Sequence, residues 1–292
     1  MKDLKPLIQH FLRSLFAAAF VFTGVSQAYA SSTQAAVDKN FAAVERAVND
    51  AGLITIVSID HARLAAEEGV EMPPSRVQIF SDPGINTAIL SENVRAGLDL
   101  PFRVLSYAQD GTVKDIYTDA EFLKIRHGLN NQKTLDSYRA RLNAVVRGVS
   151  AIAAPTQELT ADFGIIELNS SLSVGEAVSN LTEIVMAQDD TVWFGEINFT
   201  NEASKHDVTL PEAVLLLFGG PAPGGVAMAD FPSIGLDAFC QKLLVYADEN
   251  GGSVVIFNDI AALAELHYGS SAKPHQALNE QLTATFKKAL EQ

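Results

Sequence analysis

The residues best suited to chemistry are an adjacent aspartate and histidine, Asp60 and His61, at the end of an apolar, β-branched run. A carboxylate placed where a strand meets a helix caps that helix by accepting hydrogen bonds from its first N–H groups. The same place suits an anion, because a helix N-terminus offers free N–H groups and partial positive charge. The imidazole could also donate a proton or ligate a metal. The pair is therefore either a cap followed by an exposed histidine or part of a ligand site.

Three further residues complete the candidate ligand-binding set. Thr87 could supply a hydroxyl group close to His61. Arg126 and His127 end a predicted helix, where cations are favoured by the helix dipole. For His127 a structural role, with the imidazole bonded to a backbone carbonyl, competes with a ligand role. The candidate ligand-binding set is Asp60, His61, Thr87, Arg126 and His127.

Other polar or flexible segments favour structural roles. The loops 81–84 and 219–225 are rich in Gly and Pro and could cradle an anion with backbone N–H groups. They lack the lysine of a phosphate-binding loop, and such sequences are typical of turns. Asp99 and Asp237 lie in apolar runs and are expected to be buried and bonded to backbone N–H groups. Cys240 is expected to be a small core residue.

No motif identifies a metal centre or a reaction. His61 and His127 lie far apart, and no pair of histidines has the spacing that fixes a metal site on one helix. With one cysteine the chain offers neither a disulfide framework nor a cysteine-based zinc site. No serine elbow, paired-glutamate motif or Cys-His arrangement indicates a nucleophile. We expect no metal and no cofactor, and whether the chain is an enzyme stays open.

The elements that must position these residues occur twice. Residues near 59–99 match residues near 197–237 at a constant offset of 138 positions, and one inserted residue later Tyr107 matches Tyr246. The matched positions include Ile59 and Ile197, Pro73 and Pro211, Pro83 and Pro221, Asp99 and Asp237, and His127 and His267. The period is too long for a solenoid and predicts two copies of one domain.

Each copy predicts the same order of elements. In the first copy these are helix 37–48, strand 53–59, helix 62–68, strand 77–80, helix 85–96, a hairpin of 102–107 and 112–117, and helix 120–126. The second copy has strands at 193–197, 214–218, 242–246 and 253–257. It opens with strand 163–168, which the first copy lacks, and segment 149–153 is a candidate to replace it. Helices 135–149 and 275–290 end the copies.

The motifs together resemble the family called domain of unknown function 302. They are Ile59-Asp60-His61-Ala62, Pro73, Ile79-Phe80, Asp82-Pro83, Thr87, Leu98-Asp99-Leu100-Pro101 and Arg126-His127-Gly128. The resemblance covers most of residues 36–130 and, more weakly, 172–270. It implies a β-α-β(4)-α domain, found singly or in tandem, and no established activity. The second copy departs from the pattern, because Asn198 and Phe199 replace the Asp-His pair. Chemistry that needs this pair is therefore confined to the first copy.

The composition indicates the class of protein, and the N-terminal residues indicate the compartment in which it is expected. Hydrophobic residues make up 48% of the 292, and the formal charge of −14 argues against a nucleic-acid binder. A basic start, an apolar run at 15–25 and Ala28-Tyr29-Ala30 form a secretory signal. The run is shorter than the roughly 20 residues of a spanning helix. We expect cleavage after Ala30 and a periplasmic or secreted protein, with an uncleaved membrane anchor as the alternative.

The sequence thus predicts an α+β protein with signal peptide 1–30, a first domain at 31–152 and a second at 153–292, packed as a pseudo-twofold pair. The favoured function is a small-ligand-binding or accessory module with its site in the first copy. The alternatives are an enzyme with His61 as general acid or base beside Asp60, and a protein-interaction scaffold. The expected partner is a small or anionic molecule rather than nucleic acid, and the expected state is a monomer.

Overall fold

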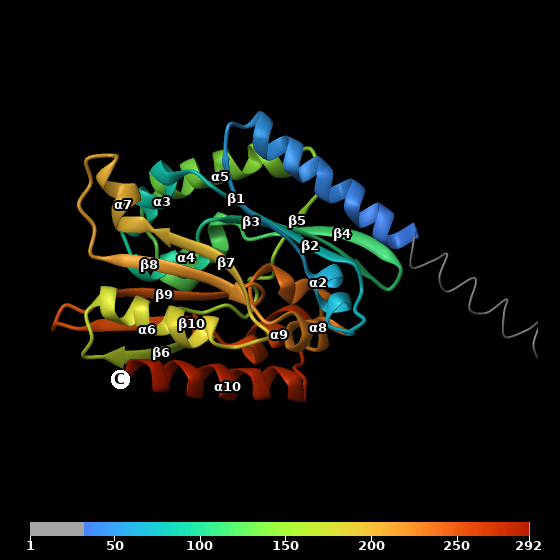
Figure 1. The fold of residues 1–292 in the computed structure, drawn as a ribbon. Coiled ribbons are helices and arrows are strands. Elements are labelled where there is room, and N and C mark those ends of the chain that lie inside the picture. Colours follow the sequence, from blue (N-terminus) through green and yellow to red (C-terminus); the bar gives the residue numbers. More distant parts are fainter. Residues whose placement is uncertain (1–31, 292) are drawn as a thin grey trace, which may run out of the picture.

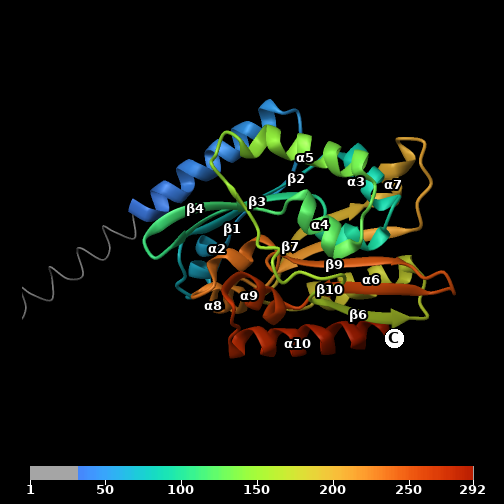
Figure 2. The same ribbon diagram turned by 180° about the vertical axis from the view of Figure 1, so that it is seen from behind.

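The computed structural model describes residues 32–291 and consists of two α+β domains arranged as a pseudo-twofold pair (Figure 1, Figure 2). The predicted signal peptide, residues 1–30, lies outside the described residues. Between residues 32 and 291 no helix is both long enough and apolar enough to cross a membrane. The two copies predicted from the sequence form two similar halves, and each half has its own five-stranded sheet.

The first domain is built on a five-stranded sheet. In spatial order its strands are β1 (Ile54–Asp60), β2 (Ser75–Ser81), β3 (Phe102–Gln109), β4 (Thr112–Tyr117) and β5 (Ile152–Ala153). The first four pair in antiparallel fashion, and β5 pairs in parallel with β4. The predicted strands and hairpin of the first copy are thereby confirmed.

Helices connect and cover this sheet. They are a helix of residues 32–50, α2 (His61–Glu67), α3 (Pro83–Leu90), the 3-10 helix η1 (Val94–Asp99), α4 (Ala120–His127) and α5 (Gln132–Val146). The first helix buries Val37, Phe41, Val44 and Val48, which confirms its amphipathic spacing. The single helix expected at 85–96 is instead two, because the Asn93 side chain caps η1 by accepting from the backbone N–H of Arg95.

The second domain repeats this plan. Its sheet has the order β6 (Ile165–Ser170), β10 (Ser253–Asn258), β9 (Gln241–Ala247), β8 (Ala213–Gly219) and β7 (Val192–Asn198). Its helices are α6 (Val174–Met186), α7 (Phe199–Ser204), α8 (Pro221–Met228), the 3-10 helix η2 (Pro232–Leu236), α9 (Ile260–Tyr268) and α10 (Lys273–Leu290). Here all strands pair in antiparallel fashion.

The two sheets differ at one edge. In the second domain β6 pairs along the whole of β10, from Ser253 to Asn258. In the first domain β5 takes the corresponding place, but its two residues pair only with Ile116 and Tyr117. Segment 149–153 therefore does replace the missing opening strand, in part and in the opposite direction.

The domains contact each other through symmetry-related pairs of elements. Helix α2 packs on α8 while α7 packs on α3, and β3 meets η2 while β9 meets η1. One hydrophobic core joins the halves, since Val77 and Leu105 belong to the same cluster as Leu215 and Leu244. A second cluster lies between the second sheet and helices α6 and α10, which lie on the opposite side of the molecule from α5 (Figure 1). The pairing creates two junctions between the domains. At one junction α2 of the first domain packs on α8 of the second, and at the other α7 of the second domain packs on α3 of the first.

Candidate functional site at the domain junction

Asp60 acts as the N-cap of α2, as its position predicts. One carboxylate oxygen accepts a hydrogen bond of 3.0 Å from the backbone N–H of Arg63. The other oxygen pairs with the Arg63 guanidinium and lies 3.3 Å from Nε of Arg76. The carboxylate is therefore occupied by a helix cap and two arginines, and none of these contacts involves the neighbouring imidazole.

His61 is buried, contrary to the exposed histidine that the capping interpretation assumed. The residue is 7% exposed, because η2 of the second domain lies against it. A hydrogen bond joins the ring to the backbone of Gly235, and Nε2 has no hydrogen-bond partner. Burial lowers the pKa of His61 to about 4, with the bond to Gly235 acting in the opposite direction. At neutral pH the imidazole is uncharged and carries one unused nitrogen.

His61 borders a cavity of about 30 Å³ between the domains. The first domain contributes Ile59, His61 and Leu64, while the second contributes the loop 219–225 and Met228. The remaining wall is made by Phe194, Phe239 and Cys240. A buried water needs roughly 10–15 Å³ of such space, so the cavity suits an ion or a group of a few atoms. The Gly- and Pro-rich segment 219–225, which was expected to be a turn, instead contains the end of β8 and the start of α8, and it forms one side of this cavity.

The close approach of the two domains depends on glycine in this loop. A Cβ added at Gly225 would lie 2.6 Å from Cβ of Ala65, and one at Gly224 would lie 3.2 Å from the Phe239 ring. Glycine at 225 lets α8 pack directly on α2. The loop is thus fixed against the first domain rather than free to fold over a ligand.

The second junction is formed by the equivalent elements, but different side chains occupy it. Phe199 begins α7 where His61 begins α2, and its side chain is fully buried. Asn86 of α3 donates hydrogen bonds to Ser81 at 2.8 Å and to Glu202 of α7 at 3.2 Å, which links the domains. Thr87 lies at this junction, and its hydroxyl donates to the Pro83 carbonyl at 2.7 Å. The structure therefore separates Thr87 from the cavity that contains His61.

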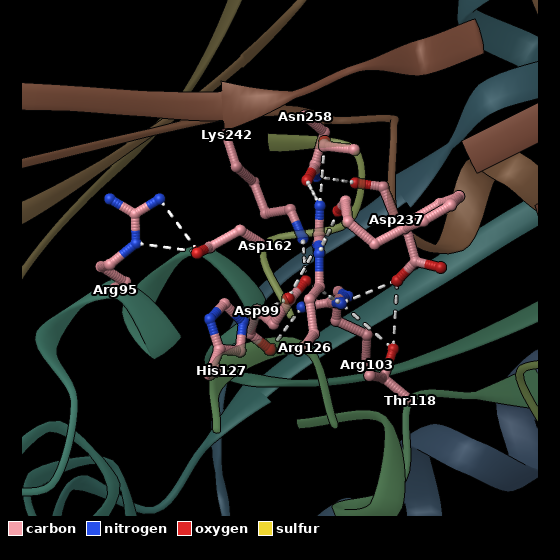
Figure 3. A network of polar contacts seen from close by, with 12 residues as sticks. Arg95, Asp99, Arg103, Thr118, Arg126, His127, Asp162, Asp237, Lys242 and Asn258 are labelled. Atoms are coloured by element: carbon pink, nitrogen blue, oxygen red, sulfur yellow. Dashed lines mark hydrogen bonds and ion pairs between the residues drawn. The ribbon is translucent and has the colours of Figure 1, made fainter. Parts of the chain in front are cut away.

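Arg126 and His127 belong to a different place again, a buried charge network between the domains (Figure 3). One Asp99 carboxylate oxygen accepts from Nη1 of Arg126 at 2.8 Å and lies 2.7 Å from Nε2 of His127. His127 therefore bonds to a carboxylate, not to the backbone carbonyl that was expected. Arg126 also donates to the carbonyls of Phe163 and Gly164 at the start of the second domain. Arg126 thus links the two halves, whereas His127 bonds to Asp99 of its own domain, and neither residue lines the cavity.

Asp237 is the counterpart of Asp99 in the same network. Its carboxylate accepts from Nη2 of Arg103 at 2.8 Å and from the Thr118 hydroxyl at 3.1 Å, and it lies 3.2 Å from Nε2 of His267. Both aspartates are fully buried, as expected, but their partners are side chains rather than backbone N–H groups. The structural role foreseen for them is confirmed and the predicted partners are wrong.

The electrostatics of the network follow from burial opposed by pairing. Burial alone would raise the pKa of Asp99, but Arg126 and His127 hold that pKa well below its usual value. The same balance, with His267 and Arg103 as partners, lowers the pKa of Asp237. Both carboxylates are therefore charged at neutral pH. Burial also lowers the pKa of His127 and keeps its ring neutral.

The sequence interpretation missed Arg103 and Lys242, which are the second residues of the inner strands β3 and β9. Arg103 bridges the domains, because the same Nη2 lies 3.2 Å from Asp99 and 2.8 Å from Asp237. The Lys242 ammonium is buried without a hydrogen bond, and Asp99 is 3.8 Å away. Burial and the Arg103 charge lower the pKa of Lys242 to about 7. The sequence did contain a signal for these two residues, because each copy has a basic residue near the start of an apolar strand.

The part of the chain that the structure describes contains no group of three or more His, Cys, Asp or Glu side chains arranged to hold a metal ion. Cys240 is buried, and burial raises the pKa of its thiol to about 11. At neutral pH this cysteine is a thiol and a poor nucleophile. The cavity thus offers a neutral imidazole and a protonated thiol among apolar walls.

Comparison with known proteins identifies relatives of parts of this chain. An 80-residue segment is 35% identical to a fluoride-specific ion channel of Brucella suis and, equally, to one of Brucella melitensis. The segment is 27% of this chain and spans 31% and 29% of those proteins. A crystal structure of an uncharacterized conserved DUF302 protein from Bacillus stearothermophilus aligns with 44% of this chain and 96% of its own, with a TM-score of 0.36 and 14% identity.

The family assignment itself rests on the whole chain. The sequence profile of Domain of unknown function DUF302 matches residues 29–149 and again residues 166–292. The first range contains strands β1 to β4 and the second contains most of the other sheet, and the motifs around His61 and His127 lie in the first range. The chain belongs to the DUF302 family and carries two copies of its domain.

Proposed function

We propose that this protein binds a small ligand in the junction cavity, with His61 as the polar contact. The observation that carries the proposal is the unused Nε2 of a buried histidine on the wall of a cavity. Buried polar atoms in folded proteins nearly always have a hydrogen-bond partner, and a buried nitrogen without a partner in the protein is suited to bond to a water, an ion or a ligand. An occupant of this cavity would supply the missing partner.

The character of the cavity restricts the ligand. Its walls are mostly apolar, and its volume of about 30 Å³ excludes a nucleotide, a sugar or a peptide. The imidazole is neutral at physiological pH, so it offers no positive charge to an anion. We infer a ligand of a few atoms, or the end of a larger one, that bonds to a nitrogen lone pair.

A binding role is better supported than catalysis. An acid–base enzyme built on the Asp-His pair needs the carboxylate to orient or tune the imidazole. Asp60 instead caps α2 and pairs with Arg63 and Arg76. The thiol of Cys240 is protonated at neutral pH, which leaves no activated nucleophile beside the cavity.

The position between the domains gives binding a structural effect. His61 lies on the first domain, and the loop 219–225 and Met228 lie on the second. A ligand that touches both sides contributes its binding free energy to their association. We propose that the protein acts in the periplasm or outside the cell, to which the signal at residues 1–30 would direct it.

The variant His61→Phe provides the test, because phenylalanine is the residue at the equivalent position of the other junction. Native mass spectrometry of the full chain and of H61F, purified in parallel, should show an added mass on the wild type only. In a second arm, 15N NMR of the imidazole nitrogens follows titration with two small hydrogen-bond donors, ethanol and propionamide, in turn. We expect at least one probe to shift His61 Nε2. No added mass and no shift with any probe would refute binding at this cavity.

A further inference from the structure

The junction cavity has three side chains on its walls that can coordinate a soft metal ion. They are the imidazole of His61, the thioether of Met228 and the thiol of Cys240. Met228 and Cys240 are buried, at 2% and 3% exposure. The donors come from α2, from the end of α8 and from the segment before β9, so they reach the cavity from separate elements.

His61 has the orientation that metal-binding histidines require. A ligating imidazole usually donates its other N–H to a carbonyl or carboxylate, which fixes the tautomer and directs the lone pair at the metal. The ring of His61 is bonded to the backbone of Gly235, and its Nε2 is buried and unpartnered. Met228 lies at the same place, since a Cβ added at Gly235 would be 3.1 Å from its sulfur. His61 and Met228 therefore both lie beside Gly235, and both line the cavity.

We propose that this site binds Cu(I) through His61 Nε2, Met228 Sδ and Cys240 Sγ, an inference that rests on ligand binding at the cavity. Thiolate and thioether ligands select Cu(I), whereas the harder divalent ions prefer oxygen and nitrogen. Binding replaces the thiol proton by the metal: a copper–sulfur bond forms, the S–H bond breaks and the proton leaves to solvent. The copper stays Cu(I) throughout, so no oxidant or reductant takes part.

Charge favours a monovalent ion. Cu(I) with one thiolate, one thioether and one neutral imidazole is uncharged, and an uncharged complex avoids the cost of burying net charge among apolar walls. A divalent ion with the same ligands would carry one positive charge. The buried cations Lys242 and Arg103, whose charges already act on the Cys240 thiol, would repel it. The cavity volume of about 30 Å³ also matches an ion rather than a larger molecule.

The second junction of the same molecule lacks all three donors. Phe199 stands in the place of His61, Leu90 in the place of Met228, and Pro101, directly before β3, in the place of Cys240, directly before β9. The differences between the junctions thus remove every metal-binding atom from one of them. This gives two variants, His61→Phe and Met228→Leu, whose new side chains already pack in an equivalent setting.

The test is a titration of the purified full chain with Cu(I), held reduced and buffered by bicinchoninate, a chromophoric competitor. We expect one equivalent bound by the wild type, and affinity lower by at least about tenfold in H61F, M228L and Cys240→Ser, as loss of a ligand requires. The variant Met186→Leu, at an exposed methionine, serves as the matched control and should bind like the wild type. Silver(I), which resists oxidation, should compete for the site, while Zn(II) should not.

Three results would overturn the proposal: no Cu(I) bound by the wild type, unchanged affinity in both M228L and C240S, or equal affinity for Zn(II). Circular dichroism of each variant establishes that it is folded. The NMR probes separate this failure from that of the proposed function. If copper does not bind but ethanol or propionamide shifts His61 Nε2, the cavity binds a different ligand. If neither occurs, both proposals fall.

Discussion

His61 and Phe199 occupy equivalent positions at the two junctions between the domains. Each is the first residue of a short helix, directly after the residue that caps it. The Phe199 ring fills its junction and approaches Gly97 so closely that an added Cβ there would be 3.1 Å away. His61 instead borders a cavity and keeps a nitrogen without a partner. One backbone position therefore serves packing in one junction and presents a polar atom in the other.

This relationship predicts different effects on stability for two exchanges. His61→Phe removes a buried polar atom without a partner but also the bond to the Gly235 backbone, and the two effects should leave the free energy of unfolding within about 1 kcal/mol of the wild type. Phe199→His buries such an atom in a filled junction and should lower it by about 1–3 kcal/mol. Urea denaturation of both variants measures the difference. Greater destabilisation by H61F than by F199H would contradict the comparison.

The low pKa of His61 predicts a dependence of stability on pH. Its folded-state pKa is about 4, whereas an unfolded histidine titrates near 6.5, so the unfolded chain binds the extra proton first. The stability associated with the neutral ring is complete above pH 6.5 and is lost as the pH falls towards 4, by roughly 3 kcal/mol in all. We expect the wild type to lose this amount relative to H61F. A constant difference between the two proteins from pH 8 to 4 would exclude it.

The buried network predicts a large cost for removing one carboxylate. Asp99→Asn leaves Arg126 with a neutral partner in a site closed to water, and we expect a loss of about 3–5 kcal/mol in unfolding free energy. Asp136→Asn removes an exposed pair with Arg139 and should cost less than about 1 kcal/mol. Denaturation of both variants under the same conditions makes the comparison, and similar losses would show that the network is unimportant.

Removing the charge of Lys242 should affect stability in the opposite way to removing the charge of Asp99. The charges of Asp99 and Asp237 are already balanced by Arg103 and Arg126, and the Lys242 ammonium has no hydrogen bond. Lys242→Met keeps the length of the side chain and should leave stability unchanged or raise it by about 1 kcal/mol near pH 7.

The same variant should also alter the response to alkaline pH. Because the folded-state pKa of Lys242 is about 7 and the unfolded value about 10.4, the wild type gains stability between these values as the pH rises. Lys242→Met should lack this gain. A loss of several kcal/mol at pH 7 would instead assign the ammonium a pairing role that its contacts do not indicate.

The N-terminal signal predicts a processed protein. The intact mass of the chain recovered from the periplasmic fraction should correspond to a start at Ser31. Ala30→Arg places a large charged residue at the cleavage point and should leave the full-length form in the membrane fraction. Recovery of the wild type with its first thirty residues attached would rule out cleavage there.

Much of the fold could be predicted from the sequence, because the signals were local. Alternating and helical spacing predicted the strands and most helices, and the constant offset predicted two domains with equivalent elements. The cap role of Asp60 followed from its place between strand and helix. The break between α3 and η1 was missed, because it depends on a single side-chain bond from Asn93.

The candidate site could be predicted only in part, because it is formed by both domains. The sequence comparison showed that His61 of the first copy is replaced by Phe199 in the second, and His61 does line the cavity. Nothing local indicated that α2 packs on α8, so the loop 219–225 and Cys240 were not connected with His61. Thr87 was grouped with His61 because both belong to motifs of the first copy, whereas the crossed pairing of helices places it at the other junction.

The covalent link between the two domains has an evolutionary consequence. In a dimer of identical single domains each substitution appears twice, so a histidine that gains a function at one interface also leaves a polar atom buried at the other. Here His61 and Phe199 are encoded separately. Duplication thus allows one interface to change while the other keeps its packing.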